Sequence, residues 1–193
     1  MLKNSLLIFL SAAVLVLSSK AVMAEDYVID SKNAHAFIQF KISHLGYSWI
    51  LGRFNRFDGT FSYDEKNPRA SKVTVTVDTA SIDTNNAERD KHLRSEKFFE
   101  VKQYPEAVFV SRSYEPKGND TGVLKGDFTL HGVTRPIEIK VKHIGAGKDP
   151  WGGFRRGFEG TARFALNDYN INTNLGPASK EVELFLSMEG IRK

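Results

Sequence analysis

Histidines are the first residues to test for chemistry, because imidazole is the commonest metal ligand in proteins and an effective general base. The chain has five of them: His35, His44, His92, His131 and His143. No two lie at the short spacings that zinc sites use, no His-Glu-x-x-His motif occurs, and there is no cysteine. We therefore predict no metal ion. His44 and His143 end alternating apolar segments, and we interpret them as hydrogen-bonded histidines at the rim of a sheet.

The sequence contains no motif for nucleophilic catalysis either. The chain lacks a Gly-x-Ser-x-Gly motif and a cysteine nucleophile, and no glycine-rich phosphate-binding loop precedes a helix. We predict that the protein is not an enzyme. The alternative that stays open is catalysis on a bound lipid, with His44 or His92 as the general base.

Arginines beside aromatic residues form two clusters. The first comprises Arg53, Phe54, Arg56 and Phe57, and the second comprises Phe154, Arg155 and Arg156. One interpretation is solvated charge beside a buried apolar row. The other is a pair of clusters near a cavity mouth, where guanidinium groups hold an anionic or polar head group.

The elements that must position these residues are mostly strands. Apolar residues alternate with polar ones in eight segments: 36–43, 56–63, 73–78, 107–113, 124–130, 137–141, 158–166 and 182–188. This period of two is typical of half-buried strands, and a ninth short strand is indicated at 27–29. Short connections favour antiparallel neighbours, so we predict an all-β, eight-stranded antiparallel barrel. A sandwich of two sheets is the alternative.

Strand-interior glycines favour the barrel over the sandwich. Gly59, Gly126 and Gly160 each lie among large apolar residues on the face predicted to point inward. Glycine weakens a strand unless the sheet bends sharply or something needs the space, and a barrel with a cavity supplies both reasons.

One segment is predicted to be helical, at about residues 86–95, with Asn85 as N-cap and Glu88 three positions later. Charged residues crowd this segment, and few of its residues are apolar. It is therefore expected to lie over the end of the sheet, either as a solvated connector or as a lid.

The first residues predict export. Lys3 precedes an apolar run from Leu6 to Leu17, and a small-residue boundary ends at Ala24, which is typical of a secretory signal peptide covering residues 1–24. Cleavage leaves residues 25–193 as a single domain whose 25 basic and 23 acidic residues give a charge of +2. That balance argues against nucleic-acid binding. The apolar run is too short to span a bilayer, so no membrane span is predicted.

Several long motifs resemble one family. Residues 44–64, 81–109 and 124–139 resemble the YceI family of exported bacterial proteins, and residues 149–160 and 172–184 are similar to its enterobacterial type. The resemblance implies an extended, lipocalin-like barrel that holds a long polyprenyl or ubiquinone-related chain. It also implies a periplasmic location, an association with alkaline stress and a homodimer. It supplies no catalytic residues.

The resemblance and the alternating pattern together predict a lipid-binding cavity. The predicted wall residues are Phe40, Ile42, Phe57, Phe61, Leu93, Phe98, Phe109, Phe128, Phe164 and Leu184. The predicted head-group residues at the mouth are His44, Tyr47, Arg53 and His92. No cofactor is expected, and the ligand is an isoprenoid or quinone-type lipid. A ligand-free interaction module is the remaining alternative.

Overall fold

The computed structural model describes residues 24–33 and 35–193, so the predicted signal peptide lies outside the described residues except for Ala24. The strands are β1 (Glu25–Ile29), β2 (Phe37–His44), β3 (Ser48–Phe54), β4 (Phe57–Tyr63), β5 (Lys72–Asp78), β6 (Ile82–Asp83), β7 (Glu106–Gly118), β8 (Thr121–Leu130), β9 (Val133–Lys148), β10 (Phe154–Ala165) and β11 (Glu181–Arg192). One α-helix, α1 (Ala87–Leu93), and four short 3-10 helices, η1 (Pro68–Ala70), η2 (Thr79–Ser81), η3 (Leu166–Tyr169) and η4 (Pro177–Ser179), complete the described part of the chain.

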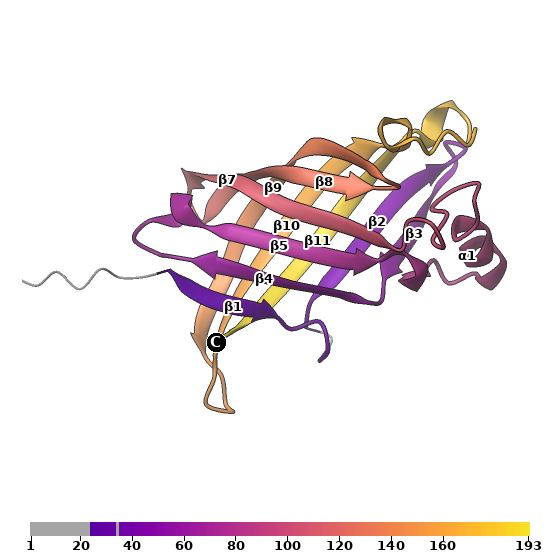
Figure 1. The fold of residues 1–193 in the computed structure, drawn as a ribbon. Coiled ribbons are helices and arrows are strands. Elements are labelled where there is room, and N and C mark those ends of the chain that lie inside the picture. Colours follow the sequence, from indigo (N-terminus) through magenta and orange to yellow (C-terminus); the bar gives the residue numbers. More distant parts are fainter. Residues whose placement is uncertain (1–23, 34) are drawn as a thin grey trace, which may run out of the picture.

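Eight of the strands close into a barrel (Figure 1). Antiparallel pairing runs from β1 through β4, β5, β7, β8, β9 and β10 to β11, and β11 pairs with β1 again. Ring closure removes the free edges of these strands, and the prediction of an eight-stranded antiparallel barrel is confirmed.

The first strands are arranged differently from a simple up-and-down barrel. β1 pairs with the last part of β11 at 190–192, and β2 pairs with the first part of β11 at 182–187. The two strands therefore share one edge of β11, one after the other. β1 closes the ring onto β4, whereas β2 leads into a β2–β3 hairpin that ends on the two-residue strand β6.

Three segments that the alternating pattern does not predict as strand are strand in the structure. Residues 48–54 form β3, in which Ile50 and Phe54 point inward while Trp49 and Leu51 are exposed. The two-residue strand β6 also lies outside the predicted strands. So does the glycine-rich stretch 145–157, most of which continues β9 and β10 as a long hairpin. Backbone pairing with the neighbouring strand overrides the low strand propensity of glycine there.

Helix α1 lies at one end of the barrel (Figure 1) and is shorter than predicted. Its N-cap is Asn86, whose side chain accepts a hydrogen bond from the Arg89 backbone N–H. The prediction of Asn85 is wrong by one position, because Asn85 adopts a left-handed turn with φ 60° immediately before the cap. The Arg94 guanidinium donates to the carbonyl oxygens of Ala80 and Ile82, which attaches the end of the helix to β6.

Inward glycines make room mainly for neighbouring side chains. A Cβ on Gly126 would collide with the Phe109 ring and the Val110 carbonyl oxygen, and one on Gly52 would collide with the Phe40 ring. Gly160 lines the cavity described below, but Gly59 and Gly126 do not. The glycines therefore serve close packing of the wall more than they create empty space.

Within the part of the chain that the structure describes, no helix has the length and hydropathy needed to cross a bilayer.

Candidate functional site: an apolar cavity in the barrel

The barrel encloses a cavity of about 590 Å³. Its wall consists mainly of Phe, Ile, Leu and Val side chains from the inward faces of the strands. The volume lies within the range of cavities that bind small molecules. Because consecutive side chains of a strand point to opposite faces, the alternating sequence supplies this wall directly.

Nine of the ten predicted wall residues line the cavity: Phe40, Ile42, Phe61, Leu93, Phe98, Phe109, Phe128, Phe164 and Leu184. Phe57 does not, and its placement corrects the prediction. It is buried in the core cluster that also contains Val77 and Tyr169, so it supports the wall from behind. That the nine residues contact a ligand stays a prediction.

The cavity opens beside α1. Three exposed residues line it: His44 at the end of β2, His92 on α1, and Asn174 between η3 and η4. Hydrogen bonds join the segments around this opening. The Ser179 hydroxyl donates to the carbonyl oxygen of Ser43 at 2.6 Å, and the Thr173 hydroxyl donates to that of Lys97. We call this opening the mouth.

Two of the four predicted mouth residues are at the mouth, and two are not. His44 and His92 line the cavity. Tyr47 is 86% exposed at the tip of the β2–β3 hairpin and does not line it. Arg53 points to the outside of β3, where its guanidinium pairs with the Asp83 carboxylate at 3.1 Å. The alternation of β3 explains this correction, because Gly52 and Phe54 occupy the inward positions on either side of Arg53.

Arg89 is a mouth residue that the sequence reasoning missed. It lines the cavity together with Thr84, and its guanidinium donates from Nε to the Thr84 hydroxyl at 2.8 Å and from Nη2 to the Thr84 carbonyl oxygen at 2.6 Å. Thr84 in turn donates its N–H and its hydroxyl to the buried Asp90 carboxylate. Nothing in the local pattern marks Arg89, because its place at the mouth depends on how α1 packs over the end of the barrel.

Arg156 closes the opposite end of the barrel. Its side chain is only 2% exposed and donates to the Tyr27 hydroxyl at 3.2 Å and to the Glu65 carboxylate at 2.5 Å. His143 lies 3.2 Å from the guanidinium, and burial together with the Arg156 charge lowers the pKa of this histidine. The second predicted arginine cluster therefore lies at the closed end, away from the mouth.

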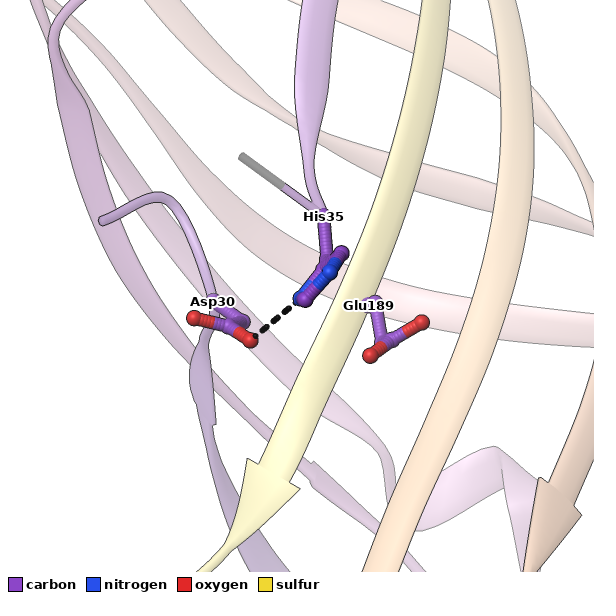
Figure 2. Close-up of side chains that lie close together, drawn as sticks. All are labelled: Asp30, His35 and Glu189. Atoms are coloured by element: carbon purple, nitrogen blue, oxygen red, sulfur yellow. Dashed lines mark hydrogen bonds and ion pairs between the residues drawn. The ribbon is translucent and has the colours of Figure 1, made fainter. Parts of the chain in front are cut away.

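A second polar cluster contains Asp30, His35 and Glu189, whose potential ligand atoms lie within 4.8 Å of one another (Figure 2). The Arg155 guanidinium lies between the two carboxylates, 2.7 Å from Asp30 and 2.5 Å from Glu189. Burial alone raises the pKa of Asp30, but hydrogen bonds from His35, Arg155 and Asn33 outweigh it and lower that pKa to about 2. The cluster is thus an ion-pair network in which an arginine supplies the cation.

The polar residues of the cavity are not arranged as a nucleophile and its base. Among the described residues, no serine or threonine hydroxyl that lines the cavity is hydrogen-bonded to a histidine ring. That pairing is what activates a hydroxyl for attack. The arrangement suits a molecule with a long apolar part and a polar end.

Comparison with known proteins agrees with this geometry. A UPF0312 protein from Ectopseudomonas mendocina (strain ymp) is 55% identical over 197 residues, covering 100% of both chains. The solved structure of a Campylobacter jejuni YCEI protein has a TM-score of 0.71 and 29% identity, covering 79% of this chain and 91% of that one. A polyisoprenoid binding domain from Saccharophagus degradans has a TM-score of 0.61 and 15% identity, covering 86% and 98%, which shows a common fold.

The family profile for the YceI-like domain matches residues 27–190, which is nearly all of the described chain. This match shows the family, and the residues that it covers form the barrel and its cavity. The chain therefore belongs to the YceI family.

Proposed function

We propose that this protein is an exported carrier that holds a long isoprenoid chain, of the polyprenyl or ubiquinone-related kind, in the cavity of its barrel. The observation that carries the proposal is the apolar cavity of about 590 Å³ with a polar mouth. Cavities of this size enclose drug-sized ligands, which corresponds to a prenyl tail of about 20 carbons. The remainder of a longer chain would lie at the mouth.

An apolar wall is sufficient for affinity. Burying a CH₂ group contributes about 0.8 kcal/mol, so about 20 carbons contribute about 16 kcal/mol, against an association cost of about 4 to 15 kcal/mol. Contacts of this kind have no direction. Cavity depth therefore selects tail length, and the polar residues at the mouth select the head group.

Family membership and the structural neighbour support the same proposal. The Saccharophagus degradans domain, which shares the fold, is a polyisoprenoid binding domain. Binding is also favoured over catalysis, because the cavity hydroxyls lack an activating histidine in the described part of the chain. The proposal requires no cofactor. The apolar N-terminal run supports export to the periplasm.

Mass spectrometry of the organic extract from natively exported protein tests the proposal, with a delipidated sample as control. We expect one long prenyl species per protein chain, whose mass gives the tail length. An empty extract, together with no uptake of added quinone or prenyl phosphate, would contradict the carrier function. Turnover of the bound lipid, abolished by His44→Ala or His92→Ala while binding persists, would instead show an enzyme.

A further inference from the structure

Arg89 brings to the mouth of the apolar cavity a guanidinium that no carboxylate of the described residues contacts directly. Among residues 24–33 and 35–193 it is the only arginine or lysine that lines the cavity. Its guanidinium forms no ion pair with any of these residues. Glu159, the one carboxylate residue among those lining the cavity, lies on β10 far from the mouth end of that strand and does not pair with Arg89.

The guanidinium is held in place by neutral groups. Both of its hydrogen bonds go to Thr84, one to the hydroxyl and one to the carbonyl oxygen. The nearby Asp90 carboxylate accepts hydrogen bonds from the N–H and the hydroxyl of Thr84, so Thr84 bridges the carboxylate and the guanidinium. Two nitrogens of Arg89 are therefore fixed, and Nη1 has no hydrogen-bond partner in the described part of the chain. A preorganised donor loses little side-chain freedom when it binds.

Three further polar residues line the cavity with Arg89, one from the same helix and two from other segments. His92 lies three residues later on α1 and packs edge-on against Phe98, with ring centroids 5.0 Å apart. His44 comes from β2, and Asn174 comes from the segment before η4. A half-buried cation that no described carboxylate contacts directly still has donors to offer an anion, and the planar guanidinium matches an oxyanion that accepts two parallel hydrogen bonds.

We propose that Arg89 binds an oxyanion head group, so that the preferred ligands are long-chain amphiphiles ending in a phosphate or a carboxylate rather than neutral ones with the same tail. This inference rests on the proposed carrier function. It names the chemical class of the ligand and the residue that recognises it. His92 and His44 contribute further hydrogen bonds to the same head group.

Two ligands with one tail test the inference: geranylgeranyl monophosphate and geranylgeraniol, each titrated into delipidated protein. We expect the wild-type protein to bind the phosphate about tenfold or more tightly than the alcohol. Arg89→Gln is expected to remove this preference, chiefly by weakening binding of the phosphate. Arg53→Gln is the matched control, because it removes the same charge near the mouth from a residue outside the cavity, and it is expected to keep the preference.

The outcomes separate the head-group inference from the carrier function. Equal binding of both ligands by the wild-type protein overturns the inference and leaves the carrier function intact, whereas no binding of either ligand overturns both. If Arg89→Gln loses both ligands equally, Arg89 is structural and the inference is wrong. Arg89→Lys keeps the charge without the paired donors, so an intermediate preference supports the inference even where Arg89→Gln folds poorly.

Discussion

The buried guanidinium of Arg156 and the carboxylate of Glu65 form an ion pair of 2.5 Å across 91 residues of sequence. The arginine is 2% exposed, whereas the glutamate lies mostly in solvent. The pair joins β10 to the segment after β4 at the closed end of the barrel, where Arg156 also packs over the Tyr63 ring at 4.6 Å. One exposed carboxylate therefore balances a charge that the fold has removed from water.

We predict that Glu65→Gln lowers the free energy of unfolding by about 1 to 2 kcal/mol, because it leaves the buried guanidinium without a counter-charge. Asp127→Asn is the control, since it breaks the exposed pair with Arg112 and should cost less than about 0.5 kcal/mol. Urea denaturation of the three proteins measures both effects. Equal losses for the two variants would mean that burial of Arg156 adds nothing to the strength of its pair.

The Asp30 network predicts acid sensitivity. The pKa of Asp30 is about 2 in the folded protein, below the value near 3.9 expected in the unfolded chain. The stabilisation is therefore complete above about pH 5 and is mostly lost as the pH falls to 2, with a size of about 2.5 kcal/mol. Urea denaturation between pH 2 and 6 should show Asp30→Asn less stable than wild type at pH 6 and equal to it near pH 2.

Asp26→Asn is the control for this experiment, because Asp26 lies exposed on β1, the strand that ends immediately before Asp30. It should change the unfolding free energy little across the same pH range. A constant difference between Asp30→Asn and wild type at all pH values would show that the carboxylate charge does not contribute.

A pair of glycines tests the packing of the wall. Gly126→Ala places a methyl group against the Phe109 ring and the Val110 carbonyl oxygen, and we expect a loss of about 1 to 3 kcal/mol. Gly145→Ala meets no atom within 4 Å, and its effect should stay within about 0.5 kcal/mol. Thermal and urea unfolding compare the two. Similar effects at both positions would show that the wall near Gly126 is loosely packed.

A charge on the cavity wall should abolish binding of the tail. Phe128 lies inside, with its ring centroid 5.5 Å from that of Phe164, so Phe128→Asp places a carboxylate in the path of an apolar chain. We expect at least about a 100-fold loss of affinity for a prenyl ligand. Phe185→Asp makes the same change on the outer face of β11, where the ring is 41% exposed, and should bind normally.

If Phe128→Asp does not fold, Leu184→Gln is the second variant for the same test. Leu184 lines the cavity, and glutamine is polar without carrying a charge. Ligand titration, with far-UV circular dichroism to confirm folding, gives the answer. Unchanged affinity in a folded Phe128→Asp or Leu184→Gln protein would show that the tail does not occupy the cavity.

The alternation of polar and apolar residues was enough to predict the barrel and the seven wall positions on its strands, because the direction of a strand side chain depends only on its place in a local period of two. Leu93 and Phe98, on and after α1, are outside that pattern. The same reasoning missed β3, although Ile50 and Phe54 alternate with Trp49 and Leu51 there. It also placed Phe57 in the cavity wall, whereas Phe57 lies in the buried core cluster and does not line the cavity. Whether an inward side chain reaches the cavity depends on which distant residues pack against it.

The sequence by itself determined the fold class, the inward face of most strands and the apolar character of the cavity, since these follow from the local pattern of side chains. Only the tertiary structure decided which polar residues meet at the mouth, that β1 and β2 share the edge of β11, and that Arg155 and Arg156 belong to the closed end. Strand register and ring closure bring together segments more than a hundred residues apart, and no local period encodes those pairings.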